Sequence, residues 1–391
     1  MFLKDIIQEL KDIKKNNLFR YLREIILLDP IHAIIEGKEV TLFCSNNYLG
    51  LTHHKEVIKA ANEALERYGV GAGAARLISG HNPLYKELEN ALAEFKQTEK
   101  TLVFSTGYTT NIGTISALVG RRDAIFCDRL AHASIIDGCF LSGARFFRFK
   151  HNDLVHLEKL IKEANAFRRR LIITEGVFSM DGDIAPLPEI YEIAKKYDAI
   201  LLVDDAHGTG VLGEGRGSLF HFNIKGERII QMATLSKAIG ALGGFVAGNK
   251  DLIDYLINKA RSFIFTTALP PSVIAAAKKA IEIIEKEPEH LKRLKENIYF
   301  LRKGLNDLGF KLPSYPTPII PLILGNEEDA LDLSKKLFDA GFFIPAIRPP
   351  TVPKGSSRLR ITISSVHKKE DIESLLDAIE FFYHRNRHRG R

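Results

Sequence analysis

The residues best suited to chemistry lie in one short run, Thr234-Leu235-Ser236-Lys237-Ala238-Ile239-Gly240. The run directly follows an apolar segment, 229–233, that reads as a buried strand. Burial lowers the pKa of an ammonium group, so a lysine at the end of such a strand can keep some free amine. A free amine on a rigid strand end can hold an aldehyde cofactor as a Schiff base. This run alone does not exclude a lysine at the start of a surface helix.

A second polar run, Leu202-Val203-Asp204-Asp205-Ala206-His207-Gly208-Thr209-Gly210, also closes a predicted strand. An unpaired buried carboxylate is costly, so Asp204 needs a partner, and a protonated pyridine nitrogen is one candidate. His207 follows one helical turn later and could donate a hydrogen bond to an oxygen on the same ring. A metal site built from Asp204, Asp205 and His207 is the weaker alternative, because no second cluster of ligands is apparent.

Further polar residues follow other predicted strands. The run 106–108 (Thr-Gly-Tyr) joins a strand to a helix, where free backbone N–H groups and the helix dipole can bind a phosphate. His132 comes just after a strand and could stack on a flat ring, although a lone histidine is more often structural. The run 69–76 is rich in glycine but does not open a helix after a strand, which disfavours a nicotinamide site.

The elements that must position these residues form an α/β pattern. From residue 54 onward, short apolar runs alternate with amphipathic helices, which is typical of a mostly parallel sheet covered on both faces. The polar runs then share the carboxyl-terminal edge of the sheet, where open α/β sheets bind ligands. The sequence predicts three parts: an N-terminal helix and short β segment (1–50), a large α/β domain (51–286) with a seven-stranded sheet, and a smaller α+β domain (287–391).

Composition narrows the class of protein. Hydrophobic residues at 45% and charged residues at 26% of 391 describe a soluble globular chain, and we find no membrane span or secretory pattern. Three cysteines without metal spacing (Cys44, Cys127, Cys139) favour a cytoplasmic location. The net charge of +7 favours anionic partners, but the basic tail 384–391 lacks interleaved aromatic residues, so we expect no nucleic acid.

Taken together, the motifs carry a resemblance to a known family. The runs S-N-N-Y-L-G-L, D-R-L-A-H-A-S, T-E-G-V-F-S-M-D-G-D, V-D-D-A-H-G-T-G, T-L-S-K-A-I-G and A-I-R-P-P-T-V-P-K-G-S-S-R-L-R occur in this order over nearly the whole chain. In this the chain resembles the α-oxoamine synthases, pyridoxal-phosphate enzymes of aminotransferase fold type I. The resemblance implies that fold, pyridoxal 5'-phosphate as cofactor, no metal, and a homodimer with its active site at the subunit interface.

The resemblance assigns the catalytic roles to four residues. Lys237 would bind the cofactor covalently and later move protons at the substrate Cα. Asp204 would pair with the pyridinium nitrogen, His207 would hydrogen-bond the ring oxygen, and His132 would stack on the ring.

Other residues would hold the cofactor without taking part in the reaction. The phosphate would be bound by the backbone of Gly107 and Tyr108 together with Thr234, and Thr266 or Thr267 would reach the phosphate of the neighbouring subunit. Glu175 and Ser179 would lie close to the ring. The phosphate turn reads S-T-G-Y where many relatives have S-G-F or S-C-F, which backbone contacts should tolerate.

The substrate residues are implied in the same way. Arg360 would bind the amino-acid carboxylate, assisted by Asn46. Arg20 and Arg348 would contact the acyl donor or the product. The runs A-H-G-T-G and A-I-R-P-P-T-V-P resemble the members that join L-alanine to a pimeloyl thioester, carried by CoA or by an acyl carrier protein. Members that use glycine and acetyl-CoA differ in both runs, and they and a broad-specificity synthase are the alternatives.

Overall fold

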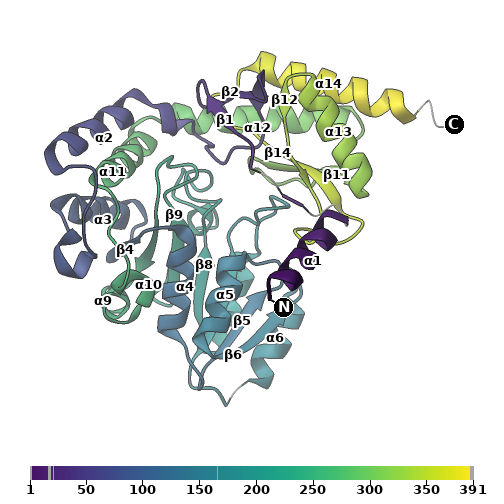
Figure 1. The fold of residues 1–391 in the computed structure, drawn as a ribbon. Helices are drawn as coiled ribbons and strands as arrows, with labels where there is room; N and C mark the ends of the chain where they lie inside the picture. Colours follow the sequence, from purple (N-terminus) through teal and green to yellow (C-terminus); the bar gives the residue numbers. More distant parts are fainter. Residues whose placement is uncertain (1, 16–18, 21, 165, 388–391) are drawn as a thin grey trace.

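The computed structural model describes residues 2–15, 19–20, 22–164 and 166–387. Figure 1 shows a large α/β part and, beside it, a smaller part that combines the elements from α12 onward with the first strands of the chain.

The large part is built on a sheet in the strand order β4-β10-β9-β8-β7-β5-β6. Only β10 runs antiparallel to its neighbours. The prediction of a mostly parallel, seven-stranded sheet is therefore confirmed. Its strands are short apolar runs buried on both faces, as in β5, where all five residues are buried. The strands are β4 Lys100–Phe104, β5 Ala124–Asp128, β6 Arg145–Phe149, β7 Arg170–Glu175, β8 Ile200–Asp204, β9 Ile229–Thr234 and β10 Gly244–Gly248.

Helices cover both faces of this sheet. One face carries a core that includes side chains of α4, α5, α9 and α10, and the other is covered by helices that include α6 and α7. The helices of this part are α2 Lys55–Tyr68, α3 Pro83–Phe95, α4 Gly107–Leu118, α5 Ala133–Ser142, α6 Leu154–Glu163, α7 Leu187–Lys196, α8 Ser218–His221, α9 Lys250–Lys259, α10 Arg261–Ile264 and α11 Pro271–Lys286, with short 3₁₀ and π turns at Leu51–His53 and Arg76–Gly80.

One predicted helix is divided in the structure. The helical pattern over 251–262 predicts a single helix, but the chain is extended at Ala260 and α10 starts in a new direction. This turn brings Phe263 into the core, where its ring meets Phe104 edge-on at 5.7 Å between centroids. The break therefore allows Phe263 to contact β4. Helical periodicity does not predict such a contact, because β4 is distant in the sequence.

Within the residues that the structure describes, the smaller part holds two further sheets and three helices. β12 pairs in parallel with β3, so the C-terminal region completes the N-terminal sheet. For the N-terminal segment the sequence predicts only a short β region with one strand over 40–44, whereas β3 spans 38–42. The elements are β1 Ile25–Leu27, β2 His32–Ile35, β3 Lys38–Leu42 and β12 Phe342–Phe343 in one sheet, β11 Ile319–Gly325, β13 Ala346–Ile347 and β14 Ser357–Thr362 in the other, and helices α12 Glu289–Asp307, α13 Glu327–Asp339 and α14 Lys369–Arg387.

The N-terminal helix α1 (Phe2–Lys15) lies on the outside of the molecule (Figure 1). None of its residues is buried, and its apolar side chains are 40–80% exposed. Its apolar stripe is thus left uncovered within this chain. Among the described residues, we find no helix with the length and apolar character that crossing a membrane requires.

Candidate active site

The side chains singled out at the predicted strand ends meet around one cavity. It has a volume of about 230 Å³ and lies where β4, β7, β8 and β9 end. Its lining includes many of the predicted site residues, namely Gly107, Tyr108, His132, Glu175, Asp204, His207, Thr234 and Lys237. The rest of the lining consists of Thr106, Asn111, Ser134, Ala206, Met232 and Ser236. The parallel sheet explains this meeting, because it places the carboxyl ends of its strands on one edge.

Lys237 extends into this cavity three residues after the end of β9. Its Nζ lies 2.9 Å from Nε2 of His207. Burial lowers the pKa of Lys237, and the carboxylates of Asp204 and Glu175 oppose this shift. Burial and the Lys237 charge also hold the pKa of His207 well below its ordinary value. The neutral imidazole can therefore accept a hydrogen bond from the amine.

A chain of hydrogen bonds leads from His207 to Arg360. The buried Tyr48 hydroxyl lies 2.7 Å from Nδ1 of His207 and donates to Oδ1 of Asn46 at 3.1 Å. The same oxygen accepts from the Arg360 guanidinium at 3.2 Å, and Nε of Arg360 donates to the carbonyl of Ser179 at 2.5 Å. Sequence reasoning includes Asn46 and Arg360 but misses Tyr48, whose only signal is its place in a run read as a polar turn.

Asp204 ends β8 deep in the cavity. Its Oδ2 accepts from Asn111 at 2.7 Å and its Oδ1 from the backbone of Ala206 at 3.1 Å. Asn111 is a second residue that sequence reasoning misses, although a buried amide within the largely apolar α4 is a signal that could have found it. Burial, reinforced by the Asp204 charge, raises the pKa of Glu175 well above its ordinary value. Glu175 also accepts from the backbone N–H of His132 at 2.6 Å.

The start of α4 forms a cradle for an anion. The Thr106 side chain caps the helix by accepting from Thr109 N at 3.0 Å. The next N–H groups, of Gly107 and Tyr108, belong to the first helical turn, which has no intrahelical acceptors for them. A Cβ on Gly107 would approach Thr234 Oγ1 to 3.2 Å, and one on Gly244 would come within 2.8 Å of the Gly107 backbone. Glycine at these positions lets β10 and α4 pack closely and leaves the cradle open.

Several predicted residues lie outside this set. Arg360, Ser179 and Asn46 do not line the cavity. Arg360 contacts both Ser179 and Asn46, and Asn46 is linked through Tyr48 to His207. Arg20 and Thr267 are exposed and Arg348 and Thr266 are partly exposed, and none of the four lines the cavity. The roles expected for these four residues therefore stay predictions.

The metal alternative finds no support in the geometry. Asp205 does not share the cavity with Asp204 and His207. Its carboxylate pairs instead with the fully buried Lys96 at 3.3 Å and accepts from Thr209 Oγ1 at 3.0 Å and from the backbone of Ser218. Asp205 therefore stabilises the loop that carries His207.

The residues around the cavity fit pyridoxal 5'-phosphate. The group needs an amine for its aldehyde, a carboxylate for its ring nitrogen, a donor for its ring oxygen and an anion cradle for its phosphate. Lys237, Asp204, His207 and the start of α4 supply these four features in one space. In addition, Oδ1 of Asn111 is buried there without a hydrogen-bond partner.

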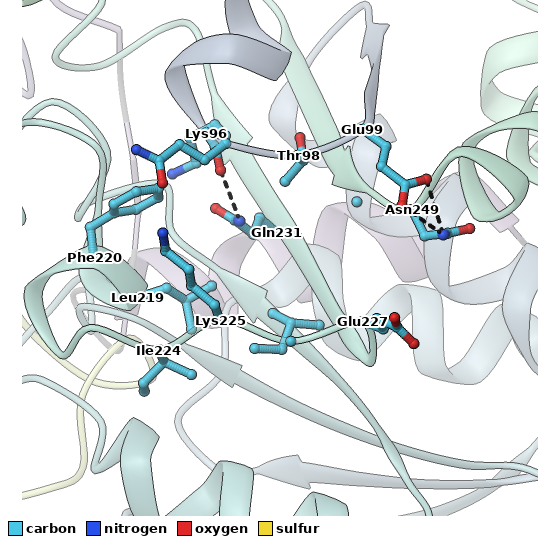
Figure 2. Close-up of a pocket in the computed structure, with 14 residues that line it drawn as sticks. Lys96, Thr98, Glu99, Leu219, Phe220, Ile224, Lys225, Glu227, Gln231 and Asn249 are labelled. Atoms are coloured by element: carbon cyan, nitrogen blue, oxygen red, sulfur yellow. Dashed lines mark hydrogen bonds between the residues drawn. The ribbon is translucent and has the colours of Figure 1, made fainter.

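A second cavity of about 270 Å³ lies at the amino-terminal edge of the sheet (Figure 2). It is lined by residues that precede β4 and β9 and by Asn249, which follows β10. Figure 2 shows two hydrogen-bonded pairs in it: Asn249 donates to Glu99, and Gln231 donates to the Lys96 carbonyl at 3.4 Å. This cavity has no cluster of buried titratable groups facing one another.

Comparison with known proteins finds similarity along nearly the whole chain. The family model described as aminotransferase class I and II matches residues 38–379. The 8-amino-7-oxononanoate synthase of Geobacter sulfurreducens (strain ATCC 51573 / DSM 12127 / PCA) is 48% identical over 380 residues, covering 96% of this chain and 97% of that protein. Other curated relatives of the same name are 46–48% identical.

Solved structures share the fold. A serine palmitoyltransferase structure with pyridoxal phosphate bound superposes with a TM-score of 0.92 at 35% identity, covering 96% of each chain. An 8-amino-7-oxononanoate synthase structure from Francisella tularensis gives a TM-score of 0.78 at 30% identity and covers 89% of this chain and 98% of that one.

Proposed function

We propose a reaction for this chain on one premise: the chain belongs to the aminotransferase class I and II family. It has the fold of the pyridoxal-phosphate enzymes of fold type I, and the predicted resemblance to the α-oxoamine synthases is confirmed. The proposed reaction is the decarboxylative condensation of L-alanine with a pimeloyl thioester. It gives 8-amino-7-oxononanoate, carbon dioxide and the free thiol carrier, and serves biotin synthesis. The enzyme is thus a pyridoxal-phosphate-dependent acyltransferase.

One observation carries the proposal. Lys237, Asp204 and His207 meet in a single cavity in a chain whose curated relatives share that synthase name. When bound, pyridoxal phosphate supplies an electron sink for negative charge that develops on the amino-acid Cα. The amine of Lys237, whose pKa burial lowers, is suited to bind the cofactor and then to take and return the proton at Cα. Asp204, fixed by Asn111, is suited to hold a positive charge at the ring nitrogen.

The substrate residues are proposed from the resemblance to the family. Arg360 is suited to orient the alanine carboxylate by a two-pronged contact, with Asn46 holding the guanidinium in place. Arg20 and Arg348 are proposed to contact the acyl donor or the product. Positive charge on these side chains suits the phosphates of CoA or an acidic carrier protein.

We further propose that two chains form the working enzyme in the cytoplasm. The apolar side chains of α1 and several of the large part are exposed, among them Phe140 (69%), Phe265 (70%) and Ile78 (81%). A partner subunit would cover such residues and bring Thr266 or Thr267 to the neighbouring cofactor's phosphate. Light scattering of the purified holoenzyme should therefore give the mass of two chains, and a monomer at assay concentration would reject this arrangement.

The reaction is tested by a competition assay. Alanine, glycine and serine are offered together with pimeloyl, acetyl and palmitoyl thioesters, on both CoA and carrier protein, and released carbon dioxide and amino ketone are identified. The proposal predicts alanine with the pimeloyl thioester as the best pair. A preference for glycine with acetyl-CoA would favour the sister activity, and a preference for serine with palmitoyl-CoA would favour the activity named for the serine palmitoyltransferase structures.

A further inference from the structure

Three potential metal ligands converge where the large part of the molecule meets the smaller one. His54 directly precedes α2, Glu287 follows the end of α11, and His290 lies in the first turn of α12. One ligand atom from each residue lies within 4.8 Å of the other two. It is the only such group of three among the described residues, and it lies apart from the cavity that holds Lys237.

The geometry is close to that of a three-ligand zinc site. Nε2 of His290 lies 3.3 Å from Oε2 of Glu287, and Nε2 of His54 lies 3.9 Å from the same oxygen. Zinc bonds of about 2.0–2.1 Å in a tetrahedron place neighbouring ligand atoms about 3.3 Å apart. The His290–Glu287 pair already has this spacing, and the His54 pair needs to close by roughly half an ångström. Glu287 can make that adjustment, because its side chain is 48% exposed.

The burial of the two imidazoles points the same way. The side chains of His54 and His290 are only 23% and 12% exposed. In both rings Nδ1 is buried without a hydrogen-bond partner. Each ring therefore turns its other nitrogen toward the one carboxylate. Two neutral imidazoles and a carboxylate are the ligand set that open zinc sites use, with water in the fourth position.

We propose that His54, Glu287 and His290 bind one divalent transition-metal ion of the zinc class. The ion would join α2 to the α11–α12 connection and so fasten the smaller part of the molecule to the large one. Arg293 lies one helical turn beyond His290 and its charge acts on that ring, so we expect weaker binding than at a four-ligand structural site. The competing interpretation is a hydrogen-bonded cluster that binds no metal.

The test uses the pyridoxal-phosphate-loaded enzyme, stripped of metal with a chelator and titrated with zinc chloride in phosphate-free buffer. Calorimetry should show one zinc ion per chain, and cobalt chloride should give the visible absorption bands of a tetrahedral site. The melting temperature should rise with zinc concentration. The variants His54→Ala and His290→Ala should each lose more than about tenfold in zinc affinity, because loss of an outer-shell partner alone costs about 10–100-fold.

His53→Ala is the matched control, because His53 is the neighbouring histidine, is exposed and lies against the Thr52 hydroxyl instead. It should keep the stoichiometry, the affinity and the zinc-dependent rise in melting temperature. Glu287→Gln is the second ligand variant, since it keeps the size of the side chain and removes its charge. Wild-type enzyme that takes up no zinc would overturn the proposal. So would zinc binding of equal affinity in the His54→Ala and His290→Ala variants, which would assign the ion to other groups.

Discussion

Two cavities of similar volume lie at opposite edges of the central sheet, about 230 Å³ at the carboxyl edge and about 270 Å³ at the amino edge. At the carboxyl edge, Glu175 and His207 are buried and the half-buried Lys237 contacts His207, and each of the three has a displaced pKa. At the amino edge, Glu99 is exposed and accepts from Asn249 and from the backbone of Lys250 at the start of α9. Volume therefore does not identify the site. The difference lies in the group of interacting titratable side chains at the carboxyl edge, whose pKa values burial displaces.

The topology explains why only one edge has this character. Strands β5, β7, β8 and β9 all end at the carboxyl edge, and α4 and α5 begin there. Helix starts expose N–H donors toward that edge, and they favour anionic ligands. At the amino edge, Glu99 and Asn249 already accept from the first N–H groups of α9, those of Lys250 and Asp251.

The largest expected effect at the carboxyl edge comes from Asp204→Asn. The substitution keeps the shape but removes the charge, so turnover should fall by about 10²–10³-fold, as for loss of one preorganised electrostatic partner. Bound pyridoxal phosphate should remain detectable by its absorbance. The measurement is steady-state turnover per bound cofactor.

Asp205→Asn is the matched control for Asp204→Asn, because it makes the same change at the neighbouring residue. It leaves the buried ammonium of Lys96 without its counter-ion, which costs roughly 3–5 kcal/mol of unfolding free energy when a buried pair is broken. We expect a large drop in melting temperature with much less effect on turnover per folded enzyme. The reverse pattern in the two variants would contradict the roles given to the two carboxylates.

Arg360→Ala should raise the KM for alanine by about 10–100-fold, the value of one or two charged hydrogen bonds. Cofactor affinity should stay within about twofold of the wild type. Arg360→Lys keeps the charge without the planar fork and should recover only part of the loss. An unchanged KM for alanine in the alanine variant would remove Arg360 from the substrate site.

The pH dependence of cofactor capture is a smaller effect. Burial lowers the pKa of Lys237 below the ordinary lysine value of 10.5, and the free amine is the reactive form. The rate at which cofactor-free protein takes up pyridoxal phosphate should therefore rise with pH and level off before pH 10.5. Because Asp204 holds the pKa of Lys237 up, the Asp204→Asn variant should level off at a lower pH. A rate that keeps rising through pH 10.5 would show an ordinary lysine.

The smallest effect is expected at the amino edge. Oγ1 of Thr98 is buried without a hydrogen-bond partner, so Thr98→Val should leave the unfolding free energy within about 0.5 kcal/mol or raise it slightly. Thr234→Val is the matched variant at the carboxyl edge. It removes the bond from Oγ1 to the Gly243 carbonyl at 2.9 Å and should cost about 1 kcal/mol. Chemical denaturation compares the two. Equal losses would mean that the edges do not differ as described.

Sequence reasoning found the ends of the strands and the residues that follow them, because those residues are local signals. Asp204 and Lys237 each close a run of buried apolar residues, and the parallel topology then places them together. The same reasoning missed Tyr48 and Asn111, whose importance depends on contacts with His207 and Asp204 far along the chain.

Sequence reasoning also missed the turn at Ala260 and the Lys96–Asp205 ion pair. In each, a residue is placed by packing against a distant element, and no spacing in the sequence encodes that partner. Thr266 and Thr267 are expected to act across a subunit interface. Their roles stay predictions, because a single chain does not test them.

The central claim is that Lys237 is the lysine bonded to pyridoxal phosphate. Borohydride reduction of the holoenzyme fixes that bond, and peptide mapping by mass spectrometry then locates the modified residue. The account predicts one pyridoxyl group per chain, on Lys237, and none in the Lys237→Ala variant. Modification of Lys96 or Lys225, which line the cavity at the amino edge, or full labelling of the variant, would contradict it.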